Sequence, residues 1–268
     1  MTYLRFIGIM IVVLFPLSFS CLHALERELR TIPTRPGVTQ SFLLIRSVDK
    51  PTASLILFAG AHGRLALSPQ GMGWGEGNFL VRNRERFAQQ GFFAAVVDAP
   101  SDHPQGLWNF RTSAAHAEDI KYVIAELKRV SDIPVWLIGA SMGTVSAANA
   151  AARLKEGGPN GLVLTSTVTK ESRQVSETVN NVRLKDIRVP TLIVHHRQDD
   201  CVLTPYELAV ALMRNLTQAP KKELITFTGG DSSVSDPCEA ISFHGFLGLD
   251  AEVVTAITSW IRAVFVSR

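Results

Sequence analysis

The sequence predicts an α/β fold in which a mostly parallel sheet carries helices on both faces. Apolar segments rich in β-branched residues alternate along the chain with segments of helical periodicity. Several of the apolar segments are continuous, which is typical of strands buried on both faces of a parallel sheet. The chain has 268 residues, of which 46% are hydrophobic, and no linker divides it. We therefore expect one large domain over residues 25–268.

Seven strands can be placed from the apolar runs. Their expected ranges are 41–48, 54–59, 92–98, 135–139, 161–166, 191–196 and 223–228. The stretch 26–41 gives no strand that can be assigned in the same way.

Helices are expected between and after these strands. Residues 114–130 carry apolar side chains at positions i, i+3, i+4 and i+7 from Ile120, which predicts one buried stripe. Thr204, followed by proline and by Glu207, has the pattern of a helix N-cap. Asp250 is expected to cap the last helix.

The first 24 residues have the pattern of an export signal. Arg5 precedes an uncharged apolar run at 6–19, and small residues follow. That run is shorter than the ~20 apolar residues of a membrane-spanning helix, so we expect a cleaved signal peptide and a periplasmic or secreted protein without a stable membrane span. Cleavage after Ser20 and cleavage after Ala24 both fit. An uncleaved anchor and a lipid on Cys21 are the alternatives.

The charge distribution argues against nucleic acid as a partner. The chain has 27 basic and 24 acidic residues, for a formal charge of +3, and they are spread along its length. No run of Lys or Arg forms a strip that could follow a phosphate backbone.

The strongest local motif is Gly-x-Ser-x-Gly at residues 139–143, with Ser141 at its centre. It follows the expected strand 135–139 and precedes a helix of small residues at 144–152. A sharp strand-to-helix turn projects the serine hydroxyl above the carboxyl end of the strand, and the glycines avoid collisions there. The start of the following helix favours developing negative charge. We therefore predict that Ser141 is a nucleophile.

A nucleophilic serine needs a general base, which an acid orients. In this architecture the order along the chain is serine, acid, histidine. His244 lies in the loop before the last helix and is the expected base. Asp199 lies just past the strand 191–196 and is the expected acid, with Asp200 as the alternative. The carboxylate would hold the imidazole tautomer and stabilise the imidazolium.

Two backbone N–H groups should stabilise the tetrahedral oxyanion. One is expected from Met142, the residue after the nucleophile. The other is expected from Ala61, in the glycine-containing loop after an early strand, with Gly60 as the alternative.

Two cysteines flank the expected acid and base. Cys201 lies two positions after Asp199, and Cys238 lies six positions before His244. If the two loops meet, the cysteines are brought close together and an exported chain would oxidise them. Such a disulfide would add roughly 3 to 4 kcal/mol in the chain-entropy model. Their spacing is unlike that of zinc ligands, so no metal is expected.

Several other polar residues are expected to play structural roles. His195 and His196 should point to opposite faces of their strand, so at most one reaches the site. His116 and Asp119 are expected to form an exposed ion pair, and Arg82 to lie on a solvated helix face.

These residues together resemble the α/β-hydrolase superfamily from about Ser41 to the end of the chain. The loop 59–63, the two histidines ending strand 191–196, the cysteine pair and the segment 244–246 resemble small exported bacterial serine hydrolases of unassigned substrate. The resemblance implies about eight strands and hydrolysis of an ester or related acyl bond of a small molecule, without a cofactor. The polar stretch 168–188 is too short for a separate lid domain, so we expect little or no lid.

Two other readings remain open. The same residues could serve a serine peptidase or a thioesterase, or the fold could serve a non-catalytic envelope protein that binds a ligand. Nothing in the sequence indicates the acyl group, the leaving group or the oligomeric state.

Overall fold

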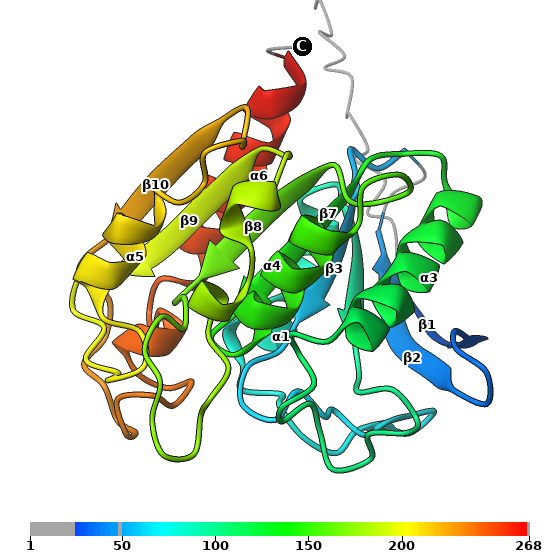
Figure 1. Ribbon diagram of the computed structural model, residues 1–268, viewed down its shortest axis with the longest axis horizontal. Coiled ribbons are helices and arrows are strands. Elements are labelled where there is room, and N and C mark those ends of the chain that lie inside the picture. Colours follow the sequence, from blue (N-terminus) through cyan, green and yellow to red (C-terminus); the bar gives the residue numbers. More distant parts are fainter. Residues whose placement is uncertain (1–24, 48–49, 267–268) are drawn as a thin grey trace, which may run out of the picture.

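The computed structural model describes residues 25–47 and 50–266, which build one eight-stranded sheet with helices on both faces (Figure 1). The strand order is β1-β2-β6-β3-β7-β8-β9-β10. The strands from β6 to β10 in this order are parallel, and β2 is antiparallel to both β1 and β6. The predicted fold class is confirmed, whereas the predicted signal peptide lies outside the described residues.

All seven predicted strands are present, with ends within two residues of those expected. The strands of the sheet are β1 (Glu26–Pro33), β2 (Thr39–Arg46), β3 (Ser54–Phe58), β6 (Phe93–Val97), β7 (Val135–Ala140), β8 (Gly161–Thr165), β9 (Thr191–His196) and β10 (Lys222–Phe227). A separate short pair consists of β4 (Leu67–Ser68) and β5 (Gly71–Met72). The strand that sequence reasoning missed, β1, is a largely exposed edge strand rich in Glu and Arg. Such a strand lacks the continuous apolar run that marks the others.

Two hydrophobic cores cover the two faces of the sheet. The helices α3 (Ala114–Val130), α4 (Gly143–Arg153) and α5 (Tyr206–Leu212) contribute to one core. The helices α1 (Phe79–Arg82), α2 (Arg84–Gln89) and α6 (Asp250–Val266) contribute to the other. Figure 1 shows α3 and α4 in front of the sheet and α6 behind it.

The stretch 168–188 packs against the first core through buried side chains such as Val179 and Leu184. It contains two 3₁₀ turns, η1 (Val179–Asn181) and η2 (Leu184–Asp186), and no longer helix. The apolar side chains of this stretch are therefore used to cover the sheet.

His116 and Asp119 do not form the exposed ion pair that we expected. Both are fully buried, and Asp119 instead accepts hydrogen bonds from Arg35 Nε at 2.9 Å and from Thr34 Oγ1 at 2.6 Å. The His116 ring lies 5.5 Å from that of Phe110, and neither of its nitrogens has a hydrogen-bond partner among the described residues. Burial, together with nearby cations, lowers the pKa of His116 to about 3. The prediction failed because the segment after β1, which the sequence left unassigned, covers this helix face.

Within residues 25–47 and 50–266, no helix combines the length and the apolar character that crossing a membrane requires.

Candidate active site

Ser141 lies at the turn between β7 and α4. Its backbone is left-handed, with φ of 52°, and its N–H donates a hydrogen bond to Thr165 O of the neighbouring strand at 3.0 Å. A Cβ at Gly139 would collide with the carbonyl of Gly143, and a Cβ at Gly143 would collide with the carbonyl of Phe58. The two glycines are therefore required by the close approach of α4 to β3 and β7, and the strained serine is held by the packing around it.

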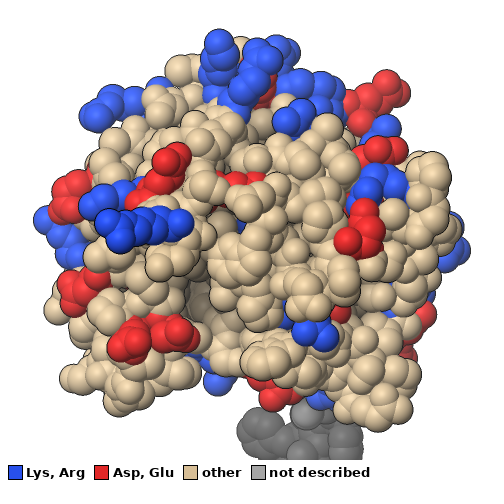
Figure 2. Space-filling model, turned by 60° about the horizontal axis from the view of Figure 1, so that its bottom comes forward, with Lys and Arg blue, Asp and Glu red and all other residues tan. Residues whose placement is uncertain are grey.

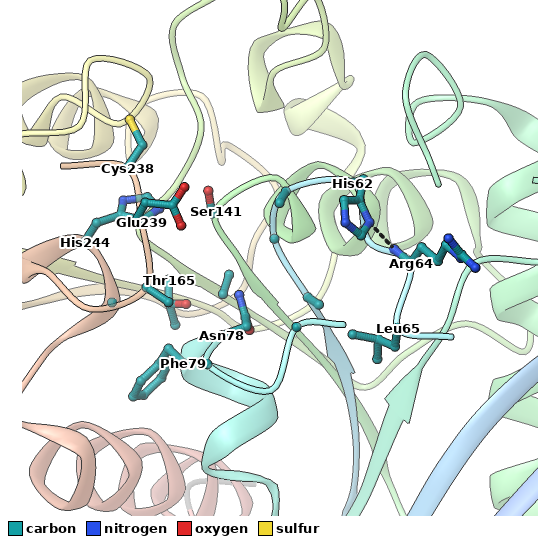
Figure 3. Close-up of a pocket in the computed structure, with 18 residues that line it drawn as sticks. His62, Arg64, Leu65, Asn78, Phe79, Ser141, Thr165, Cys238, Glu239 and His244 are labelled. Atoms are coloured by element: carbon teal, nitrogen blue, oxygen red, sulfur yellow. Dashed lines mark hydrogen bonds between the residues drawn. The ribbon is translucent and has the colours of Figure 1, made fainter. Parts of the chain in front are cut away.

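Ser141 and His244 line one cavity of about 260 Å³ at the carboxyl ends of the parallel strands (Figure 3). The other walls come from the loop after β3 (59–65), the loop before α1 (75–79) and residues 238–240. No residue of the stretch 168–188 lines the cavity. The stretch 168–188 thus forms no lid over the cavity.

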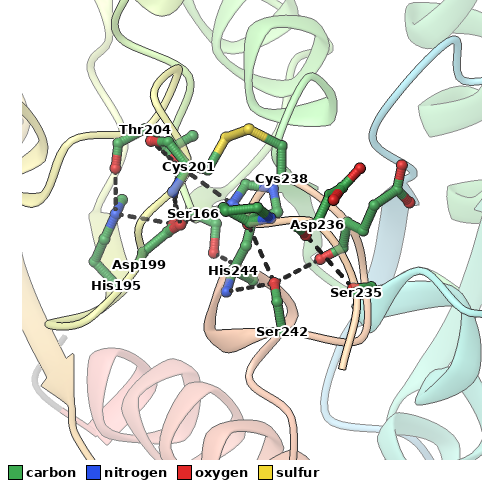
Figure 4. Close-up of a disulfide and its surroundings, with 12 residues drawn as sticks. Ser166, His195, Asp199, Cys201, Thr204, Ser235, Asp236, Cys238, Ser242 and His244 are labelled. Atoms are coloured by element: carbon green, nitrogen blue, oxygen red, sulfur yellow. Dashed lines mark hydrogen bonds and ion pairs between the residues drawn. A yellow bond between two sulfur atoms is a disulfide. The ribbon is translucent and has the colours of Figure 1, made fainter. Parts of the chain in front are cut away.

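His244 lies in the turn η3 (Phe243–Gly245), which neighbouring hydroxyls hold in place. Ser166 Oγ donates to the His244 carbonyl at 2.6 Å, and His244 N–H donates to Ser242 Oγ at 3.1 Å. His244 Nδ1 lies 3.0 Å from Asp199 Oδ2 (Figure 4). Its Nε2 is buried and has no hydrogen-bond partner among the described residues, Ser141 included. The imidazole is therefore oriented by a carboxylate through Nδ1, and its residue lines the same cavity as the serine.

Asp199 is buried, whereas Asp200 is exposed. Burial alone would raise the pKa of Asp199, but hydrogen bonds from His195 and His244 hold it well below its usual range. The Cys201 N–H adds a further hydrogen bond to Asp199 Oδ1 at 3.1 Å. Of the two candidate acids, the structure places Asp199 against His244.

Thr204 contacts both Asp199 and His244, and the sequence did not predict this role. Its hydroxyl donates to Asp199 Oδ2 at 2.9 Å and lies 3.2 Å from His244 Nδ1. The expectation that Thr204 caps a helix is wrong, because α5 begins at Tyr206 after Pro205 and has no side-chain cap. A threonine before proline has the same pattern in either role, so only the three-dimensional contacts distinguish them.

His195 and His196 point to opposite faces of β9, as expected from strand alternation. His195 Nε2 lies 2.9 Å from the carbonyl oxygen of Thr204 and 3.4 Å from Asp199 Oδ2. His196 stacks on Phe243, with ring centroids 4.7 Å apart, and burial lowers its pKa. Of the two, His195 is therefore the one that contacts the candidate acid.

The backbone N–H groups of Met142 and Ala61 donate no hydrogen bond to any described residue. Ala61 has φ of 47°, and its carbonyl accepts a hydrogen bond from Arg111 Nη2 at 2.9 Å. Gly60 packs directly against the nucleophile, since a Cβ there would lie 3.0 Å from the Cβ of Ser141. Of the two residues, Ala61 lines the cavity, whereas Met142 is buried beside the nucleophile.

Arg111 is a fully buried cation beneath this loop, and no sequence signal marked it. Besides the Ala61 carbonyl, it reaches Ser146 Oγ at 2.7 Å. Burial lowers the pKa of Arg111 to about 10, although the negative charge of Glu177 acts to raise it. Arg111 therefore holds the loop from below while remaining charged near neutral pH.

Arg82 is not on a solvated helix face. It forms an ion pair with Asp250 at 2.8 Å and donates to the carbonyls of Gly245 at 2.6 Å and Ala240 at 3.2 Å. The side chain thereby ties α1 to the loop that carries His244.

Cys201 and Cys238, which lie 37 positions apart in the sequence, form the predicted disulfide (Figure 4). The bond joins the loop of Asp199 to the segment that precedes His244. No group of three or more His, Cys, Asp or Glu in the described part of the chain could hold a metal ion. Figure 2 turns the loops at the bottom of Figure 1 toward the reader, and the middle of that face carries few charged side chains.

The strand order, the strained serine turn and the positions of the acid and histidine loops are those of the α/β-hydrolase fold. No family model and no curated protein matches the chain. Among solved structures, an α/β serine hydrolase without a lid from Xanthomonas campestris shares 15% identity, covers 94% of this chain and 97% of its own, and has a TM-score of 0.60. An esterase from Pyrococcus furiosus shares 16% identity, with 95% of both chains covered and a TM-score of 0.64.

A third similar structure is an acylaminoacyl peptidase from Pyrococcus horikoshii. It shares 11% identity and has a TM-score of 0.62, with 91% of this chain but 42% of that chain covered. At these identities the three structures establish the fold.

Proposed function

We propose that this chain is an exported serine hydrolase that cleaves an ester or related acyl bond of a small molecule. One observation carries the proposal: Ser141, in a strained turn, lines the same cavity as His244, whose other side is bound to the buried Asp199. A carboxylic-ester hydrolase is the favoured class, because structural neighbours are named esterases and serine hydrolases.

In the proposed reaction, His244 Nε2 takes the proton from the Ser141 hydroxyl as its oxygen attacks the carbonyl carbon. The N–H groups of Met142 and Ala61 stabilise the oxyanion of the tetrahedral intermediate. The imidazolium then gives the proton to the leaving group, and an acyl-enzyme forms. Water, deprotonated by the same imidazole, hydrolyses it. Asp199 stays ionised throughout, consistent with the direction of its pKa shift.

Export is proposed on two independent features. Residues 1–24 have the pattern of a cleaved signal peptide, which would leave residues 25–268 as the mature domain. The Cys201–Cys238 disulfide is of a kind that persists in oxidising compartments such as the periplasm or the extracellular space.

Labelling with a fluorophosphonate probe tests the nucleophile. We expect the wild-type protein to be labelled and the Ser141→Ala variant to remain unlabelled. Hydrolysis of 4-nitrophenyl acetate should be lost in the same variant. Equal labelling of the two proteins, or hydrolysis that survives the substitution, would show that Ser141 is not the nucleophile.

One observation keeps a non-catalytic binding protein as the second candidate: Ser141 and His244 are not hydrogen-bonded to each other. In unliganded hydrolases such a bond often tightens only when substrate binds, so the geometry also suits an enzyme. The probe experiment separates the two functions, and a panel of esters, thioesters and peptides would separate the hydrolase subclasses.

A further inference from the structure

Two side chains of opposite formal charge, Glu239 and Arg64, line the candidate cavity together with its histidines. In Figure 3, Glu239 lies beside Ser141 and His244, whereas Arg64 lies at the other end, past His62. Neither charged group forms an ion pair or a side-chain hydrogen bond with another described residue. The cavity is therefore electrically polarised, and its negative end is the one next to the candidate nucleophile.

The backbone that carries Glu239 is held firmly. The preceding residue, Cys238, is bonded to Cys201. The Glu239 N–H donates to Asp236 O at 2.9 Å, and its carbonyl accepts from Ser242 Oγ at 2.7 Å. The exposed Glu239 side chain thus projects into the cavity lining from an anchored backbone.

The charge of Glu239 is left uncompensated by the protein. The cation that reaches this segment, Arg82, is already paired with Asp250. A carboxylate at this position opposes the negative charge that develops on the substrate oxygen during attack by Ser141. A cationic group on the substrate would offset this repulsion, whereas an anionic group would add to it.

We infer that Glu239 selects substrates bearing a positively charged ammonium group close to the scissile acyl bond. The inference rests on the proposed hydrolase function and specifies its substrate class. The ammonium group would lie at the Glu239 end of the cavity, away from Arg64. Esters with a carboxylate or phosphate at that position would be poor substrates.

The test compares two esters of the same shape, acetylcholine and 3,3-dimethylbutyl acetate, which differ in having a charged nitrogen or a neutral carbon. We expect the wild-type protein to have the higher kcat/KM for acetylcholine. In Glu239→Gln the ratio of the two kcat/KM values should fall about three- to fivefold at low ionic strength, the size expected for one exposed charge pair. Added salt should shrink the wild-type preference.

Glu118→Gln is the matched control, because Glu118 is an exposed glutamate on α3 that lines no part of the cavity. Its ratio should equal that of the wild type. The contrary outcome is that both esters are hydrolysed in a Ser141-dependent way while Glu239→Gln keeps the wild-type ratio of the two kcat/KM values. That result would overturn the inference and leave the proposed function intact.

A second measurement applies if neither ester is cleaved but the fluorophosphonate probe still labels Ser141. Choline should then slow the labelling more than 3,3-dimethylbutan-1-ol does, and Glu239→Gln should abolish the difference. Equal protection by the two alcohols would overturn the inference. Absence of labelling would refute the proposed function and, with it, the inference.

Discussion

Replacing Thr204 by valine should slow the proposed hydrolysis without weakening substrate binding. Valine has nearly the same shape but lacks the hydroxyl that donates to Asp199 Oδ2 at 2.9 Å and contacts His244 Nδ1 at 3.2 Å. Thr204 is fully buried and does not line the cavity. The change therefore acts on the orientation of the carboxylate and imidazole, and we expect kcat to fall while KM stays close to the wild-type value.

The size of the effect follows from the bond that is lost. A buried hydrogen bond to a charged acceptor contributes about 1.5 to 3 kcal/mol. If the transition state, in which His244 becomes an imidazolium, loses that amount relative to the enzyme–substrate complex, kcat falls by about 10- to 150-fold. The free energy of unfolding should fall by an amount of the same order, because Asp199 loses one of its donors in the folded state.

Steady-state kinetics on a neutral ester, together with urea denaturation, would measure both quantities. Thr204→Ser is the matched control, because it keeps the hydroxyl and removes only the methyl group. The reasoning is refuted if Thr204→Val keeps kcat within about twofold of the wild type, or if the serine variant loses as much activity as the valine variant.

Two further predictions concern stability. Replacing Cys201 and Cys238 by serine should lower the free energy of unfolding by about 4 kcal/mol in the chain-entropy model for a loop of this size; equal urea midpoints for this variant and the oxidised wild type would contradict it. His116→Phe should change how the free energy of unfolding depends on pH in the acidic range. The pKa of His116 is about 3 in the folded protein and about 6.5 in an unfolded chain, so the unfolded state binds more protons as the pH falls from about 6.5 towards 3 and the wild type is destabilised there. The phenylalanine variant should lose less stability over this range in thermal melts, and a wild-type-to-variant difference that does not vary with pH would disprove this assignment.

The sequence sufficed to place the central strands because each is a continuous apolar run that burial on both faces requires. The edge strand β1 could not be placed in this way. Its charged residues are satisfied by partners far along the chain, such as Glu126, which pairs with Arg30. The predicted disulfide followed from the idea that two loops meet, and it is present.

The site's supporting residues were beyond sequence reasoning for a related reason. Arg111 and Arg82 are long polar side chains that would ordinarily lie at the surface. Their burial depends on backbone carbonyls supplied by loops distant in sequence, those of Ala61 and Gly245. No local sequence pattern predicts which backbone carbonyls will accept hydrogen bonds from these side chains.

The Cys201–Cys238 bond has a consequence for the edge of the sheet. The covalent loop that it closes contains α5 and β10, the outermost parallel strand. Edge strands are where sheets open locally and where they pair with other chains. With both ends of this segment joined, β10 can separate from β9 only as a closed loop. Amide hydrogens of β10 should therefore exchange faster after reduction, and the oxidised protein should resist aggregation through this edge.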